Sequence, residues 1–151
     1  MARKLRSFSA PDSVSLRPIR GHGKGRDNPV DLCERNVGPI PPGTYYLIDR
    51  QSGGRSGWIR DLAEPYVGST DRRVWFTLWN AHGGDVTNVC NIQRGNFRLH
   101  PEGPARESDG CITIRNPLDF DRLQRFIRLH KPDLPIPGQP AMKAYGRVEV
   151  R

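Results

Sequence analysis

Long apolar runs are missing from this sequence of 151 residues. Because a bilayer-spanning helix needs about 20 consecutive apolar residues, we expect no membrane span. The first residues, MARKLRSFSAPDSVSLRP, are basic but lack the apolar core of a secretory signal peptide. The sequence therefore predicts a protein made in the cytoplasm that, if it acts elsewhere, leaves by a route other than a standard signal sequence.

Cysteine clusters and nucleic-acid motifs are also missing. The three cysteines are too dispersed for a disulfide framework or a paired CxxC zinc site, so no metal centre is expected. The formal net charge of +8, mostly from arginine, favours an anionic partner such as nucleic acid, an acidic membrane surface or the bacterial cell wall. The arginines are scattered without a dense basic run, which disfavours a specific nucleic-acid binder.

Turns and short β-favouring runs predict a mainly β fold. The chain has 16 glycines and 14 prolines, and few long periodic runs, which favours short strands over helical bundles. We expect about six to eight strands. The clearest β-favouring runs lie at residues 44–48, 74–79, 97–100, 111–114 and 145–150.

One clear α-helix is expected over about residues 117–130. Asn116 suits its N-cap and Pro117 its first position, and apolar residues recur along one face. Pro132 should stop the helix, and the proline-rich segment 132–140 is interpreted as a linker.

The length fits one domain with a core of its own. Residues 1–27 are polar, basic and punctuated by proline and glycine, so we expect a flexible N-terminal arm there. The folded domain is expected to span residues 28–151.

The stretch NFRLHPEGPARESDGCITIR, residues 96–115, places one histidine and one cysteine at the facing ends of two expected neighbouring strands. A thiolate is the reactive form of cysteine and a nearby imidazole generates it, so His100 suits a general base and Cys111 a nucleophile. Gly110 leaves room for a substrate carbonyl, and the backbone N–H groups of Gly110 and Cys111 suit an oxyanion hole. The alternative is that both side chains are ordinary structural residues, as buried Cys and His often are.

The pattern around this pair resembles the His-Gly…Ser-His-Gly-Cys signature of the L,D-transpeptidase (YkuD-like) family. It is more similar to a divergent branch, the L,D-transpeptidase effectors delivered by type VI secretion, in which FRLHPxGPxxxSxGCITI occurs. A second matching segment, VGPIPPGTYY, lies at residues 37–46, and the likeness runs from about Asn28 to about Leu123. The resemblance implies an L,D-transpeptidase-like β-sandwich with a catalytic domain over residues 28–151. The catalytic residues that it implies are Cys111, His100, Gly110 and Ser108.

Two positions depart from the pattern of the better-known enzymes of that family. Asp109 stands where they carry a second histidine, so His100 is the only local base candidate, and a backbone carbonyl or Ser108 is expected to orient it. Thr113 stands where they carry an arginine, and Arg115 lies two positions further on. If the strand continues, both point to the same face, about 6.6 Å apart, so Arg115 suits a stem-peptide carboxylate.

Substrate contacts are expected from Arg115, Arg98 and Trp58. The alternative for an arginine at a strand end is an ordinary surface position, and the alternative for a tryptophan is a place in the core.

The resemblance implies an antibacterial, peptidoglycan-modifying toxin that acts as a cysteine-dependent L,D-carboxypeptidase or L,D-transpeptidase. Its substrate would be a tetrapeptide stem, attacked between the third residue, usually meso-diaminopimelate, and D-alanine, without a metal or organic cofactor. Implied partners are peptidoglycan stem peptides, the type VI secretion machinery and a cognate immunity protein, with action in the periplasm of a target bacterium. The alternatives are a non-catalytic cell-wall or nucleic-acid binding module, and a different cysteine peptidase or acyltransferase of the cytoplasm.

Two cysteines remain if Cys111 is the nucleophile. Cys33 and Cys90 either pair as a disulfide in an oxidising compartment or stay as two isolated buried thiols. A Cα separation well above about 7 Å would exclude the bond.

Overall fold

The computed structural model describes residues 18–20, 29–33, 38–50, 66–67, 70–103 and 110–151. The strands in this part of the chain are β1 (Pro18–Arg20), β2 (Gly43–Asp49), β3 (Tyr66–Val67), β4 (Thr70–Asp71), β5 (Phe76–Asn80), β6 (Val86–Val89), β7 (Ile92–Gly95), β8 (Arg98–Pro101), β9 (Ile112–Ile114), β10 (Leu134–Ile136), β11 (Gln139–Ala144) and β12 (Gly146–Val150). The helical segments are the 3-10 helices η2 (Pro29–Cys33) and η3 (Arg72–Val74) and the α-helix α2 (Pro117–Arg128). The predicted mainly β fold is confirmed, and the described residues contain the one predicted α-helix.

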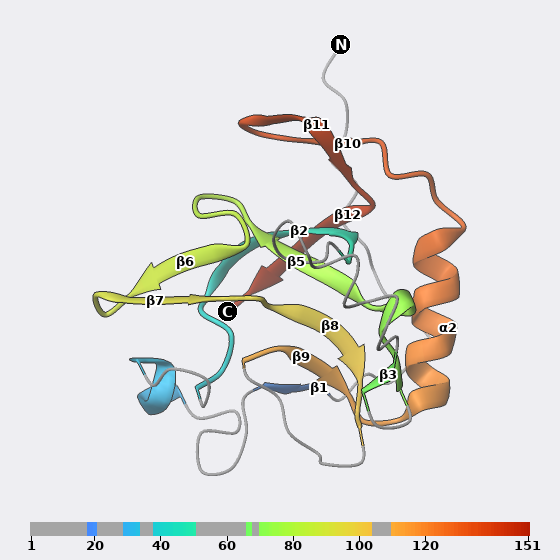
Figure 1. The fold of residues 1–151 in the computed structure, drawn as a ribbon, viewed down its shortest axis with the longest axis horizontal. Helices are drawn as coiled ribbons and strands as arrows, with labels where there is room; N and C mark the ends of the chain where they lie inside the picture. Colours follow the sequence, from blue (N-terminus) through green and yellow to red (C-terminus); the bar gives the residue numbers. More distant parts are fainter. Residues whose placement is uncertain (1–17, 21–28, 34–37, 51–65, 68–69, 104–109) are drawn as a thin grey trace.

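Six strands form one curled sheet in the order β1-β9-β8-β5-β2-β12 (Figure 1). Neighbours in this sheet are antiparallel except β8 and β9, which are parallel. The remaining strands pair as three small sheets, β3 with β4, β6 with β7 and β10 with β11. Strand β5 begins two residues later than predicted because Arg72–Val74 turns as η3, which is capped by the side chain of Asp71.

One face of the large sheet packs against helix α2 (Figure 1). Every second strand residue points to this face and joins the helix in one buried apolar cluster. Its members include Leu47, Phe76, Leu78, Leu99, Ile114, Phe120 and Ile127. The helix starts as predicted, because the side chain of Asn116 accepts a hydrogen bond from the backbone N–H of Leu118 and Pro117 follows the cap. It ends at Arg128, two residues before the predicted end.

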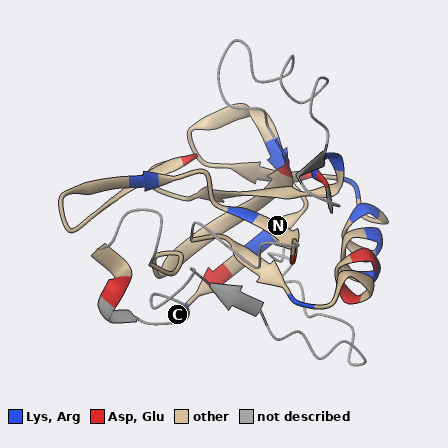
Figure 2. Cartoon of the chain, turned by 60° about the horizontal axis from the view of Figure 1, so that its bottom comes forward, with Lys and Arg blue, Asp and Glu red and all other residues tan. Residues whose placement is uncertain are grey.

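The outward face of helix α2 carries interleaved acidic and basic residues (Figure 2). Asp119 pairs with Arg122 at 3.7 Å and Asp121 with Arg125 at 3.0 Å. Exposed pairs of this kind add little to stability, so packing of the apolar face holds the helix in place. Among the described residues, no helix is long and apolar enough to cross a membrane.

The β10–β11 hairpin covers part of the opposite face of the sheet. Its buried Ile136 and Ala144 pack against Tyr46 and Ile48 of β2. The interpretation of residues 132–140 as a linker is therefore wrong. The prolines are tolerated because they lie in an exposed two-stranded hairpin, where few ladder hydrogen bonds are lost, and Gly138 turns the chain with φ of 72°.

Part of the segment expected to be a flexible arm belongs to the sheet. Pro18–Arg20 forms β1 and pairs with β9, the strand that follows Cys111. The rest of residues 1–27 lies outside the described residues, so the boundary at residue 28 stays a prediction.

Candidate active site

His100 lies on β8 and Cys111 lies just before β9. These two strands are neighbours, as predicted, but they are parallel. Leu99 lies opposite Ile112, and His100 lies opposite Thr113. The predicted arrangement of facing strand ends is therefore wrong, because the parallel register offsets His100 and Cys111 by two residues along the sheet. Side chains alternate along a strand, so His100 and its partner Thr113 point to the face opposite helix α2, and Cys111 precedes Thr113 by two residues, the repeat of this alternation. Diagonal positions of this kind are about 7–8 Å apart at Cα, within reach of an imidazole and a thiol.

Two hydrogen bonds hold the ring of His100. Its Nδ1 lies 2.8 Å from the carbonyl oxygen of Pro101, and its Nε2 lies 3.3 Å from the hydroxyl oxygen of Thr113. A carbonyl oxygen can only accept, so Nδ1 carries the proton and Nε2 of the neutral ring holds a lone pair. A backbone carbonyl thus orients the histidine, which is one of the two expected arrangements, and Nε2, which faces the Thr113 hydroxyl, is the ring nitrogen that holds the lone pair.

Trp75 stacks on the imidazole of His100. The two ring centroids are 4.5 Å apart with an interplanar angle of 24°. The pairing of Phe76 with Leu99 explains this contact, because the next pair in an antiparallel register is Trp75 with His100. The indole therefore fixes the plane of the ring, while the two hydrogen bonds fix its rotation.

Cys111 is a buried thiol immediately before β9. Its sulfur lies 3.8 Å from the carbonyl oxygen of Asn96, which itself has a positive φ of 58°. Gly110, just before the thiol, has φ of 86°, a backbone conformation that residues with a Cβ rarely adopt. The glycine therefore shapes the turn that presents the sulfur, in addition to leaving room beside it.

The predicted substrate contacts are placed differently from one another. Arg98 is buried and donates from Nη1 to the carboxylate of Asp85 at 2.7 Å, so its guanidinium already has a structural partner. Arg115 is exposed and follows the last residue of β9, so the strand does not continue through it as the sequence argument assumed. Trp58 and Ser108 lie outside the described residues.

A disulfide joins Cys33 at the end of η2 to Cys90 in the turn between β6 and β7, with a Cα separation of 5.6 Å. This confirms the pairing over two isolated thiols. The bond closes a loop with a sequence separation of 57, which is worth about 4 kcal/mol in the chain-entropy model.

Sequence reasoning missed Arg94, Asn96 and the role of the Thr113 hydroxyl, and it did not foresee that Trp75 stacks on His100. Trp75 and Thr113 become recognisable only once the register of β5, β8 and β9 is known. Arg94 lies in the β6–β7 hairpin, which no strong alternating pattern indicated. For Asn96 a signal existed, since Asn tolerates positive φ better than most residues.

Comparison with known proteins places the chain in a family. No curated protein and no solved structure matches it. The family model described as the Tlde1 domain matches residues 19–138, which include most of β1, the His100–Cys111 site and helix α2. This match covers most of the sequence, and the chain therefore belongs to the Tlde1 domain family of type VI secretion effectors.

Proposed function

We propose that the chain is a cysteine-dependent enzyme that modifies peptidoglycan, acting as an L,D-carboxypeptidase and L,D-transpeptidase on tetrapeptide stems. One observation carries this proposal: a histidine with an assigned ring proton lies on β8, and a buried thiol lies immediately before its parallel neighbour β9. The L,D-transpeptidase motif around them and membership of an effector family support the substrate and the antibacterial role.

The first chemical step is acylation of the thiol. His100 takes the proton of Cys111 on Nε2, while its Nδ1–H stays hydrogen-bonded to the carbonyl of Pro101. The thiolate attacks the carbonyl carbon of the third stem residue, meso-diaminopimelate, and forms a tetrahedral intermediate. The C–N bond to D-alanine then breaks, D-alanine leaves as an amine with the proton from Nε2, and a thioester remains on Cys111.

The negative charge of that intermediate needs donors. The backbone N–H groups of Gly110 and Cys111 form the proposed oxyanion hole, and the positive φ of Gly110 supports it by turning the chain sharply at this point. A donor of this type typically contributes about 10²–10³-fold to the rate.

The thioester then partitions among three acceptors. Water gives L,D-carboxypeptidase action, a free D-amino acid gives exchange, and the side-chain amine of a neighbouring stem gives a cross-link. Each acceptor gives a proton to Nε2 of His100 as it attacks the thioester carbonyl. The C–S bond then breaks, and the leaving thiolate of Cys111 takes that proton from Nε2, which restores the thiol and the neutral imidazole.

The substrate contacts follow from charge and position. Arg115 is exposed beyond β9 and is proposed to bind a stem-peptide carboxylate. Trp58 is proposed to contact the stem and Ser108 to support the site. The net charge of +8 favours approach to the anionic cell wall, with the type VI machinery delivering the protein to the periplasm and an immunity protein protecting its producer.

Purified protein and tetrapeptide muropeptides test this function. We expect mass analysis to show loss of one D-alanine with the native protein, no loss with Cys111→Ala, and full activity with the exposed-helix control Arg125→Met. Intact muropeptides after incubation with a folded native protein would contradict the proposal, and so would turnover that survives Cys111→Ala.

Expression in two compartments tests the biological setting. With a secretory signal fused to it, the protein should cause cells to swell or lyse, and Cys111→Ala should protect them. Without the signal it should be nearly harmless. Killing by the cytoplasmic form that persists after loss of the thiol would instead favour a nucleic-acid target.

A further inference from the structure

A buried arginine outside the motif, Arg94 on β7, holds together the segments behind the thiol. Only 4% of the Arg94 residue is exposed to solvent. Its Nη1 donates to the carbonyl oxygens of Leu32 and Pro39, each at 2.8 Å, and its Nη2 donates to that of Gly38 at 2.7 Å. A guanidinium presents its donors in a rigid planar fork, so one side chain fixes the end of η2 and the segment that enters β2.

Gly110 packs directly on this guanidinium. A Cβ built on Gly110 would lie 2.6 Å from Nη2 of Arg94 and 3.2 Å from the carbonyl oxygen of Gly38. The turn that presents Cys111 therefore rests on Arg94 and on the segment that Arg94 holds. A shift of the guanidinium would move the backbone next to the nucleophile.

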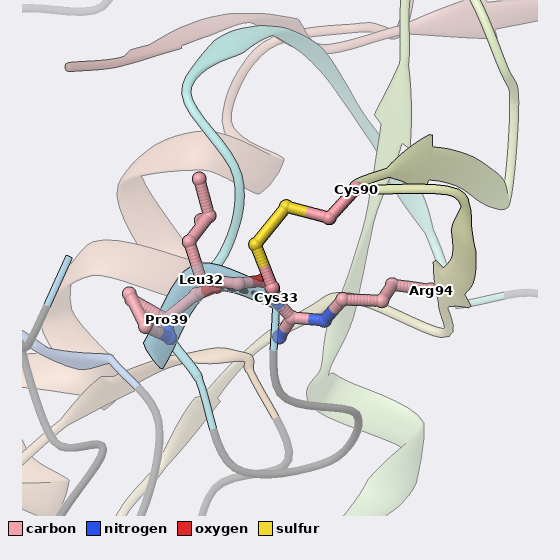
Figure 3. The surroundings of a disulfide bond; sticks show 5 residues. All are labelled: Leu32, Cys33, Pro39, Cys90 and Arg94. Carbon is pink, nitrogen blue, oxygen red and sulfur yellow. Dashed lines mark hydrogen bonds between the residues drawn. A yellow bond between two sulfur atoms is a disulfide. The ribbon is translucent and has the colours of Figure 1, made fainter. Parts of the chain in front are cut away.

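The disulfide also links η2 to the β6–β7 hairpin, which carries Arg94. Cys90 lies in the turn of the β6–β7 hairpin and Arg94 lies on its second strand, while Cys33 and Leu32 are adjacent in η2 (Figure 3). The covalent bond and the hydrogen bond from Arg94 to Leu32 thus tie the same two elements at neighbouring points. Without the covalent bond, the attachment of η2 to the hairpin would depend more strongly on the hydrogen bond from Arg94 to Leu32.

The charge of Arg94 bears on the thiol as well. Burial lowers the pKa of Arg94 from its ordinary value, but a guanidinium stays protonated at neutral pH. Burial raises the pKa of the adjacent Tyr45 to about 12, so its phenol stays neutral. His100 on β8 and the ion pair of Arg98 with Asp85 are further titratable or charged groups on or beside the neighbouring strand. A positive charge beside the turn favours the thiolate.

We propose that Arg94 is a positioning residue for the Gly110–Cys111 turn and that the Cys33–Cys90 disulfide keeps it in place. The reactivity of the nucleophile then depends on the redox state of the other two cysteines. This regulation rests on the proposed function only for its biological meaning, since thiol reactivity can be measured without substrate.

The redox step fits the delivery route. Cytoplasm keeps thiols reduced, and the periplasm favours disulfides. On arrival, the thiols of Cys33 and Cys90 lose two electrons and two protons to the disulfide of a periplasmic thiol–disulfide oxidoreductase, which becomes a dithiol. The same oxidation assembles the site in the compartment that holds the cell wall.

Alkylation with iodoacetamide between pH 5 and pH 9 tests the proposal, because Cys111 is the only thiol in the oxidised protein and in a Cys33→Ser/Cys90→Ser variant. We expect Arg94→Met to raise the pH midpoint of the alkylation rate by about one unit. At a fixed pH below the midpoint, the variant should then be alkylated about tenfold more slowly than the native protein. Loss of the disulfide should slow alkylation similarly. Arg94→Lys, which keeps the charge, should restore the midpoint but lower kcat for D-alanine release, and Arg125→Met should match the native protein.

An unchanged alkylation profile in Arg94→Met would overturn the role of Arg94. A native profile in the disulfide-free variant would overturn the redox dependence. Near-ultraviolet circular dichroism checks folding, and if Arg94→Met does not fold, Arg94→Lys and reversible reduction of the native protein decide between the same outcomes. If alkylation depends on Arg94 but muropeptides are not turned over, this inference is supported and only the proposed peptidoglycan substrate is contradicted.

Discussion

The two faces of the β8–β9 strand pair are equally buried but differ in what fills them. Leu99, which points toward helix α2, is 6% exposed, and the next residue, His100, which points the other way, is 7% exposed. Leu99 packs in the apolar cluster, whereas His100 meets the carbonyl of Pro101, the hydroxyl of Thr113 and the ring of Trp75. A buried polar group is costly unless it is hydrogen-bonded. Alternation along one strand therefore supplies a packing face and a face of oriented, reactive groups.

Alanine substitutions of two adjacent residues, one on each face, should differ most in their effects on activity and stability. His100→Ala should lower D-alanine release about 10²–10⁴-fold, because the general base is lost, and should lower the free energy of unfolding less than Leu99→Ala does. Leu99→Ala should lower the free energy of unfolding by about 2–5 kcal/mol and leave turnover near native below its melting temperature. Steady-state rates and denaturant unfolding measure both. The assignment of one face to packing and the other to catalysis would be contradicted if His100→Ala were the more destabilising change. It would also be contradicted if folded Leu99→Ala were less active than His100→Ala.

A pair of glycine substitutions separates backbone strain from contact with the site. Gly110 and Gly138 have φ of 86° and 72°, so alanine should cost about 1–2 kcal/mol of stability at either position. Only Gly110 has a neighbour, Nη2 of Arg94, that a Cβ would meet; around Gly138 there is open space. We expect about a 10²-fold loss of kcat for Gly110→Ala and native kcat for Gly138→Ala. Equal rates in the two variants would remove Gly110 from the site.

The hydroxyl of Thr113 offers a finer test of the polar face. Thr113→Val keeps the shape but removes the donor to Nε2 of His100, so kcat should fall about tenfold, the equivalent of one hydrogen bond. Thr113→Ser keeps the donor and should stay near native. If valine and serine behave alike, the hydroxyl does not orient the ring.

The smallest expected effect is at the edge of the site. Arg115→Ala should raise KM a few-fold with kcat unchanged, because an exposed arginine contributes uniform binding of a carboxylate. Arg125→Ala on the outer face of helix α2 serves as the control. A fall in kcat without a change in KM would assign Arg115 a different role.

Local signals explain what the sequence could predict. The helix is marked by Asn116 and Pro117, and β2, β5 and β12 by aromatic or β-branched runs, so these elements were predictable from short windows. Whether β8 and β9 pair in parallel depends on the path of the chain between them, and no short sequence window encodes that path. The β10–β11 hairpin was missed because proline suggested a linker.

The motif segments also show where sequence analysis ends. VGPIPPGTYY and SDGCITI were recognisable separately, but nothing in either indicates how they meet. Arg94, from a hairpin outside both, donates to Gly38 and Pro39 of the first and packs under Gly110 of the second. Contacts of this kind depend on the three-dimensional arrangement of the chain.

The central claim is that the thiol on the polar face becomes acylated by a tetrapeptide stem. Intact-protein mass spectrometry of the native protein, quenched in acid soon after mixing with a tetrapeptide muropeptide, measures this directly. We expect an adduct equal in mass to the muropeptide minus D-alanine, which peptide digestion maps to Cys111 and which is missing in Cys111→Ala. Release of D-alanine without any adduct on Cys111, or an adduct on another residue, would contradict it.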